Sequence, residues 1–365
     1  MRKRPSPRGH QPVKPDRVAF TLVELLVVFA ILATLMNILL PALKTARDQA
    51  KTIHCAATQH GFGTGLSTYF TENDDWIPGR NTTGFEVWKA SFEVATGTDP
   101  DALQKPRMPV QTYDWMTPIL RTTVTLSGTR AERFRFLLDH YKCAAVDFTA
   151  VLYSGSRPDD EQDFLDDIDA HGPFPGISYL MPGYFQFWGT DDAAAQQFIG
   201  TAEAGFGTTG LPVKAPASFF DVKMTRYRSR VNQVGTPAEK IAAADGTRYL
   251  PTSKVLDFDH HEDPERSVHL QDLGWYGSFT SSGAWWQGST AYGTRQAHNP
   301  ARGANLKLTY RHGGKIEALF FDGHVQGLTQ TESRAIGYWY PRGSEIRRRL
   351  PPWYANDYSI GDRVH

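Results

Sequence analysis

The fold is decided near the N-terminus by the stretch 19-AFTLVELLVVFAILATLMNILLPAL-43. Its apolar run from Phe20 to Leu40 is 21 residues long. As an α-helix, such a run measures about 30 Å, which is enough to cross the hydrocarbon core of a bilayer. Its strongly polar members are Glu24 and Asn37, and a carboxylate in a bilayer is costly, although less so near the interface. A plain membrane anchor therefore explains the length of the run but not Glu24.

The residues in front of this run are basic. Of the 39 basic and 39 acidic residues in the chain, six and one respectively lie in residues 1–19. A basic segment before a long apolar run is typical of a targeting sequence that starts in the cytoplasm. The chain of 365 residues has no net charge, so its composition does not indicate a nucleic-acid partner. Its 12% of aromatic residues favours a folded protein.

The motif Phe20-Thr21-Leu22-Val23-Glu24, together with the basic leader and Pro41, resembles the methylation motif of type IV pilins and type II secretion pseudopilins. The resemblance implies that a prepilin peptidase cuts between Ala19 and Phe20 and that Phe20 becomes N-methylated. It also implies that Glu24 pairs with the ammonium of a neighbouring subunit's Phe20, since a buried charge is tolerable only when it is paired. That family usually has glycine before the cut, and Ala19 is expected to slow the cleavage rather than to prevent it. The alternative is an uncleaved membrane anchor.

The helical pattern continues beyond Pro41. The segment 61-GFGTG-65 weakens it, because each glycine costs about 1 kcal/mol relative to alanine. The turn-rich segment 73-NDDWIPG-79 should end it. We expect one helix over 20–72, transmembrane in about 20–42, with its second half packed on a globular head. Leu66, Tyr69 and Phe70 indicate that the helix resumes after the glycines. Beyond Pro41 the helix is amphipathic, with a stripe of small and apolar residues: Leu43, Ala46, Ala50, Ile53 and Ala57.

Residues 73–365 are expected to form a strand-rich head, which gives an α+β, pilin-like fold with an antiparallel sheet. Insertions are expected near 155–170, as an acidic solvated loop, and near 189–210. A helix is predicted over 131–141. Strand-like composition marks five segments: 177–189, 240–246, 306–311, 316–321 and 325–328. The last three are predicted to form a meander with two tight turns.

His312 and Asp322 are separated by nine residues, and Gly323 follows. This spacing resembles the H-X9-DG signature of large prepilin-like proteins of planctomycetes and related bacteria. Segments around Cys55, around residues 178–179 and over 237–246 are similar to the same family. The resemblance implies an architecture rather than an activity.

Several residues are candidates for a metal site. His312, Asp322 and His324 are of the right types for zinc, but the simpler interpretation is that Asp322 caps its own turn and His312 bonds across the hairpin. The acidic residues from 159 to 169 could supply some calcium ligands, but calcium needs six or more oxygens. Neither a metal nor another cofactor is expected. The chain lacks GxSxG and HExxH motifs and a phosphate-binding glycine loop, so an enzyme is not expected.

The chain has two cysteines, Cys55 on the long helix and Cys143 after the predicted helix over 131–141. An oxidising periplasm would permit one disulfide between them. The alternative is two buried, unpaired cysteines that act as small apolar residues.

These expectations favour a structural, minor or tip subunit of a type II secretion pseudopilus or a type IV pilus-like filament. Its place would be the inner membrane, single-pass, with a periplasmic head. Its partners would be a prepilin peptidase, other pilin or pseudopilin subunits and the inner-membrane assembly platform. The alternative function is a membrane-tethered extracytoplasmic binding module for polysaccharide or exported cargo, since 285–286 and 338–340 carry aromatic residues that could stack on sugars.

Overall fold

The structure is a computed structural model. It describes residues 21–79, 96–110, 114–121, 128–146, 148–150, 152–153, 161–186, 222–224, 227–247 and 308–346, with 358–365 and short stretches between these ranges. The predicted leader 1–19 with Ala19, the residue Phe20, the insertion at 189–210 and the aromatic pair 285–286 lie outside the described residues. The chain divides into two compact units, one up to Arg47 and the other from Asp48.

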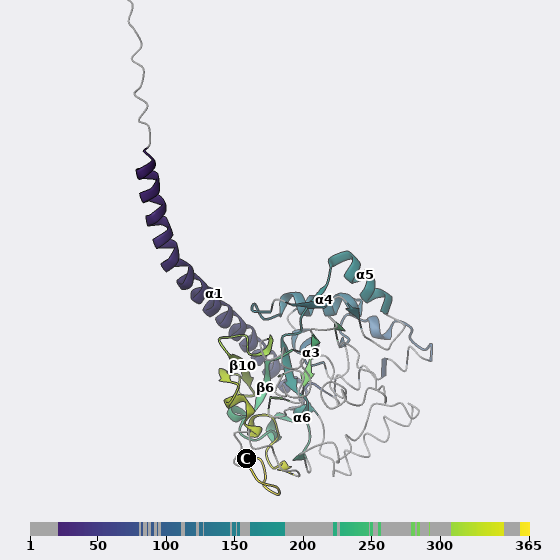
Figure 1. The fold of residues 1–365 in the computed structure, drawn as a ribbon. Helices are drawn as coiled ribbons and strands as arrows, with labels where there is room; N and C mark the ends of the chain where they lie inside the picture. Colours follow the sequence, from purple (N-terminus) through teal and green to yellow (C-terminus); the bar gives the residue numbers. More distant parts are fainter. Residues whose placement is uncertain are drawn as a thin grey trace, which may run out of the picture. The chain divides into compact units, whose positions relative to one another are not determined.

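Helix α1 runs without interruption from Leu22 to Glu72, as Figure 1 shows. Its start is a capping box, in which the Thr21 hydroxyl accepts a bond from Glu24 N (3.2 Å) and the Glu24 carboxylate accepts one from Thr21 N (2.9 Å). Pro41 lies inside the helix. Residues 21–50 are exposed, and α1 is long and apolar enough near the N-terminus to cross a membrane. The predicted long N-terminal helix is confirmed from Leu22 to Glu72.

The face of α1 that packs in the head is not the stripe from Leu43 to Ala57. Ile53 is 70% exposed, and Leu43 is exposed as well. The head instead covers a second stripe, which carries the aromatic residues Phe62, Tyr69 and Phe70. Both stripes have helical spacing, so the spacing alone does not predict which of them is buried. The aromatic stripe offers more apolar area to bury, which makes it the more favourable face. The buried residues of α1 are Cys55, Gln59, Phe62, Gly63, Leu66, Tyr69 and Phe70.

A five-stranded sheet lies at the centre of the head, in the order β11-β10-β6-β4-β9. Neighbouring strands are antiparallel except β4 and β9, which are parallel. The strands predicted in 240–246, 316–321 and 325–328 are confirmed, and the fold is α+β. The strands of this sheet are β4 (Tyr179–Pro182), β6 (Ile241–Asp245), β9 (Thr280–Ser281), β10 (Lys315–Phe320) and β11 (Val325–Thr329).

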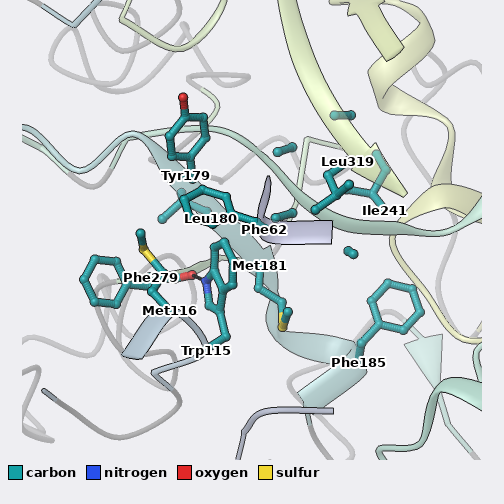
Figure 2. Close-up of a cluster of buried hydrophobic side chains, with 14 of the residues drawn as sticks. Phe62, Trp115, Met116, Tyr179, Leu180, Met181, Phe185, Ile241, Phe279 and Leu319 are labelled. Atoms are coloured by element: carbon teal, nitrogen blue, oxygen red, sulfur yellow. Dashed lines mark hydrogen bonds between the residues drawn. The ribbon is translucent and has the colours of Figure 1, made fainter. Parts of the chain in front are cut away.

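The core forms where α1 meets this sheet (Figure 2). Phe62 packs edge-on against Trp115 and Tyr179, at ring-centroid distances of 5.2 and 5.4 Å. The indole of Trp115 donates a hydrogen bond to the backbone oxygen of Phe279 (2.7 Å), which leaves its buried N–H satisfied. Leu319 and Ala243 are directly opposite each other on β10 and β6, so their side chains lie on the same face of the sheet.

The predicted first strand of the meander, 306–311, is wrong where the structure describes it. Leu308 and Thr309 are helical, so β10 and β11 form a hairpin rather than part of a meander. The Arg311 guanidinium donates a hydrogen bond to the backbone oxygen of Leu308 (2.9 Å). The segment 177–186 is likewise only half strand, because β4 is followed by helix α6 (Gly183–Gln186).

The acidic segment predicted as a solvated loop near 155–170 is a helix, α5 (Glu161–His171), in its described part. Phe164 is buried against Phe134 of helix α4 (Arg130–His140), at a ring-centroid distance of 6.0 Å. Arg135 donates to Asp167 (2.7 Å), which joins the two helices. The buried apolar side chain of Phe164 therefore packs α5 on the head despite the acidic composition of this segment. The helix predicted over 131–141 is confirmed.

The remaining described elements are short. They are helices α3 (Met116–Leu120), η2 (Ala102–Gln104), η3 (Val231–Gln233), η4 (Pro237–Glu239), η7 (Glu332–Arg334) and η8 (Ile336–Tyr338), and strands β1 (Thr149–Ala150), β2 (Leu152–Tyr153), β3 (Phe174–Pro175), β5 (Val222–Lys223), β7 (Tyr249–Leu250), β8 (Val255–Leu256) and β12 (Glu345–Ile346).

Candidate functional site

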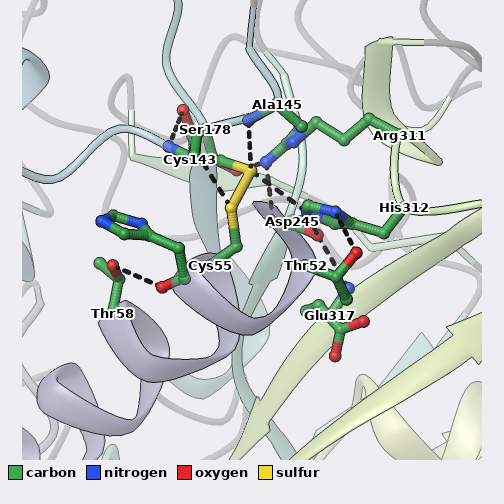
Figure 3. Close-up of a disulfide and its surroundings, with 12 residues drawn as sticks. Thr52, Cys55, Thr58, Cys143, Ala145, Ser178, Asp245, Arg311, His312 and Glu317 are labelled. Carbon is green, nitrogen blue, oxygen red and sulfur yellow. Dashed lines mark hydrogen bonds and ion pairs between the residues drawn. A yellow bond between two sulfur atoms is a disulfide. The ribbon is translucent and has the colours of Figure 1, made fainter. Parts of the chain in front are cut away.

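The most connected group of polar side chains in the described part of the head surrounds a disulfide (Figure 3). Cys55 of α1 and Cys143, shortly after α4, are bonded to each other with their Cα atoms 5.2 Å apart. Both residues are buried. The bond closes a loop of 88 residues, for which chain entropy corresponds to about 4–5 kcal/mol of stabilisation. We name this group the disulfide cluster: Cys55, Cys143, Ser178, Asp245, Arg311 and His312.

Backbone amides surround the two sulfur atoms. Ala144 N donates to Cys55 Sγ (3.2 Å), and Ala145 N donates to Cys143 Sγ (3.4 Å). Cys143 N in turn donates to the Ser178 hydroxyl (3.0 Å), which fixes the segment after α4 against β4. The sulfurs are therefore held by a turn of the backbone as well as by their own bond.

His312 points into this cluster. Its Nδ1 lies 3.2 Å from the Thr52 hydroxyl, and its Nε2 lies 3.2 Å from Cys143 Sγ and 3.3 Å from Asp245 Oδ2. The Thr52 hydroxyl donates its own hydrogen to the backbone oxygen of Asp48 (3.0 Å), so it accepts from His312 and Nδ1 carries the hydrogen.

The predicted side-chain bond of His312 across the hairpin is therefore wrong. The turn is closed instead by backbone bonds between His312 and Lys315, at 3.2 and 3.3 Å. Gly313 and Gly314 adopt positive φ values of 63° and 84°, which lets the backbone close the turn without help from a side chain. The imidazole is left to turn toward α1 and the disulfide.

Asp245 is the buried anion of the cluster. Arg311 Nη2 donates to Asp245 Oδ1 and to the Ser178 backbone oxygen, both at 2.7 Å. Glu317 N donates to Asp245 Oδ2 (2.8 Å). Sequence reasoning missed Asp245 and Arg311. The available signals were an aspartate that ends the buried alanine run 242–244 and an arginine directly before His312.

The Asp322-Gly323 turn is a second contact between the hairpin and α1. Asp322 Oδ1 accepts a bond from His324 N (3.1 Å), so the predicted capping of the turn is confirmed. Gly323 has a φ of 92°, as a tight turn requires. A Cβ on Gly63 of α1 would lie only 3.3 Å from Gly323 Cα. Glycine at position 63 therefore allows the turn to approach the helix.

The H-X9-DG spacing thus has a structural meaning in this chain. His312 contacts α1 at Thr52, and Gly323 approaches α1 at Gly63. These two helix positions are roughly 16 Å apart along the axis, and the six residues of β10 span about 20 Å. The motif attaches both ends of β10 to one helix.

The zinc set weighed from the sequence is not assembled. Asp322 and His324 bond to each other at one end of β10, whereas His312 lies at the other end. Instead, the ligand atoms of Cys55, Cys143 and His312 all lie within 4.8 Å of one another.

A polar surface groove of about 490 Å³ lies beside the Asp322-Gly323 turn. The aromatic residues Trp339 and Tyr340, weighed as sugar-stacking residues, are fully buried and belong to the core. The residues that line the groove are His60, Gly63, Thr64, Ser67, Asp322, Gly323 and His324.

The disulfide cluster joins separate segments of the head to one another. One covalent bond joins α1 to the segment after α4, and one buried ion pair joins β6 to the turn before β10. Comparison of the chain with protein-family models, with curated proteins and with solved structures gives no match.

Proposed function

We propose that this chain is a structural subunit, minor or at the tip, of a type II secretion pseudopilus or a type IV pilus-like filament. In this proposal the first part of α1 is held in the inner membrane and the head lies in the periplasm. The observation that carries the proposal is α1 itself. Its first part exposes an apolar surface around Glu24, and its second part is covalently bound to the head.

Glu24 is suited to an intersubunit contact. Thr21 N and the Thr21 hydroxyl both donate to Oε2 of Glu24, at 2.9 and 2.7 Å. A carboxylate has about four acceptor positions, so Oε1 can accept from the ammonium of a neighbouring subunit. The capping box keeps the carboxylate satisfied before assembly, and the neighbour adds an opposite charge during assembly.

The exposed stripe of α1 from Leu43 to Ala57 supports the same proposal. Leu43 and Ile53 lie on α1 beyond the apolar run and are both exposed. Ala46, Ala50 and Ala57, between and after them, are exposed as well. A helix face of small and apolar residues allows close packing against the same helix of another subunit.

The size of the head favours a minor or tip position, because bulk limits dense stacking. In this proposal a prepilin peptidase, other subunits and the assembly platform are the partners. A second candidate function, a membrane-tethered module that binds polysaccharide or exported cargo, is supported by the polar groove at the Asp322-Gly323 turn.

The test compares two substitutions in the capping box. Glu24→Ala removes the partner of the neighbour's ammonium, and we expect it to abolish incorporation into sheared filaments. Thr21→Ala costs about 1 kcal/mol at the helix start but keeps the carboxylate, so incorporation should persist. Immunoblots of filament and membrane fractions provide the readout.

Normal incorporation of the Glu24 variant would show that the pairing does not drive assembly. A wild-type chain that stays in the membrane fraction, while the organism's filaments form without it, would favour the binding module.

A further inference from the structure

We propose that the disulfide cluster becomes a metal site when the disulfide is reduced, with Cys55, Cys143, His312 and Asp245 as ligands of one Zn²⁺ ion. This inference is independent of the filament function, because it concerns only the chemistry inside the head. Thiolate and imidazole are the ligands that zinc takes in tetrahedral sites.

The positions of the ligand atoms carry the proposal. A tetrahedral zinc ion with ordinary bond lengths holds its ligand atoms roughly 3.3–3.8 Å apart. His312 Nε2 lies 3.3 Å from Asp245 Oδ2 and 3.2 Å from Cys143 Sγ. The atoms of Cys55, Cys143 and His312 lie within 4.8 Å of one another. After reduction, rotation about the Cα–Cβ bonds can bring the sulfurs to the required separation.

The hydrogen bonds show which of these atoms can accept a bond from a proton or a metal ion. Because the Thr52 hydroxyl donates to Asp48, it accepts from His312 Nδ1, and Nε2 faces Cys143 Sγ and Asp245 Oδ2. Asp245 Oδ2 lies 3.3 Å from His312 Nε2 and accepts a hydrogen bond from Glu317 N. In the disulfide form, a proton on Nε2 can satisfy both atoms. In the reduced form, a metal ion can take the place of that proton.

The surrounding groups match those of a metal centre. The amides of Ala144 and Ala145 donate to the two sulfurs, and such donors stabilise thiolates. The Thr52 hydroxyl holds the other ring nitrogen of His312, as outer-shell groups do at histidine-ligated metals.

The charges also balance. Two thiolates and the Asp245 carboxylate carry three negative charges, while Zn²⁺ and Arg311, which is bonded to Asp245, carry three positive charges. Cancellation of the charges of the ligands, the ion and Arg311 lowers the desolvation cost below that of an isolated ion. The carboxyl group of Glu317, next to Asp245, is outside this count.

The interconversion needs a dithiol reductant. Two electrons and two protons from the reductant convert the disulfide to two thiols, and the reductant itself becomes a disulfide. Binding of Zn²⁺ then releases the two thiol protons to water. A disulfide oxidant, which accepts the two electrons and becomes a dithiol, reforms the disulfide and releases the ion. Both forms hold the same four segments together: α1, the turn after α4, β6 and the turn before β10.

The experiment uses the full chain in detergent micelles, reduced without oxygen by a phosphine and titrated with Co²⁺, a spectroscopic substitute for Zn²⁺. We expect one Co²⁺ per chain with the visible absorption of tetrahedral thiolate ligation. The oxidised chain should bind none. His312→Ala should lose this absorption, whereas His324→Ala, on the same hairpin, should keep it. Thr52→Val should weaken affinity by about 10–100-fold.

Two results would overturn the proposal. One is a folded, reduced chain that gives no cobalt–thiolate absorption. The other is an equal loss of the absorption in the His312 and His324 variants. If reduction alone unfolds the head, added Zn²⁺ must restore the near-ultraviolet circular dichroism of the aromatic core, and failure to restore it would equally reject the site.

Discussion

At the residue scale, Glu317 and Asp245 lie side by side on adjacent strands, on the face of the sheet that packs against α1. The side chain of Glu317 is only 7% exposed. Burial, and then the negative charge of Asp245, raise the pKa of Glu317 above its usual value. The folded chain therefore binds this proton more tightly than the unfolded chain does. The resulting stability is present below the unfolded pKa and is lost as pH rises through the folded pKa.

Glu317→Gln removes a charge that the folded chain disfavours at neutral pH. We expect a higher melting temperature at pH 7, with a gain on the order of 1 kcal/mol. The gain should shrink toward pH 4, where the wild-type carboxyl is protonated. Thermal melts across this pH range provide the measurement, with Glu72→Gln, an exposed position on α1, as the control. A gain of the same size at every pH would refute this explanation.

At the element scale, the glycines of 61-GFGTG-65 do not interrupt α1. A Cβ on Gly63 would lie 3.0 Å from Leu319 Cδ1 as well as close to Gly323, and one on Gly65 would lie 3.2 Å from Ile119 Cβ. At Gly61, no other atom lies within 4 Å of such a Cβ. Two of the three glycines therefore permit close packing, which compensates for their low helix propensity.

This difference predicts opposite effects for one substitution at two neighbouring sites. Gly61→Ala should stabilise the head by about 1 kcal/mol through helix propensity alone. Gly63→Ala gains the same propensity but forces Leu319 and the Gly323 backbone to move, at a cost of about 1–3 kcal/mol. We expect a net loss of stability at position 63. Chemical denaturation of both variants measures this, and equal gains at the two positions would contradict the close packing.

Elements with a strong local pattern could be predicted from the sequence. The apolar run and its continuation predict α1, and the glycine turns predict the hairpin of β10 and β11. The helical conformation of Leu308 and Thr309 could not be predicted, because 306–311 has a strand-like composition. Helix α5 was missed because its acidic composition obscured Phe164, which packs against α4.

At the scale of the whole molecule, the candidate site depends on contacts between residues distant in the chain. Thr52 and His312 are 260 positions apart, and Cys143 and His312 are 169 apart. Local patterns carry no information about such contacts, so within this cluster the sequence marks only the cysteines and His312, by their residue types. The pairing of β6 with β10 is what brings Asp245 into this cluster.

Three contacts connect α1 to the rest of the head, so a force applied to α1 would be transmitted to the head. The disulfide, the bond between Thr52 and His312, and the contact of Gly63 with the Asp322-Gly323 turn join the helix to three separate segments of the head. Such joints suit a subunit whose helix is held by neighbours while its head faces the solvent.

The central claim is that α1 begins a processed filament subunit, and the N-terminus of the mature chain tests it most directly. The full-length protein would be extracted from membranes and its N-terminal peptide identified by mass spectrometry. We expect the peptide to begin at Phe20 and to carry one methyl group on its amino nitrogen. A chain that begins at Met1 or Arg2, with its basic leader intact, would contradict the claim.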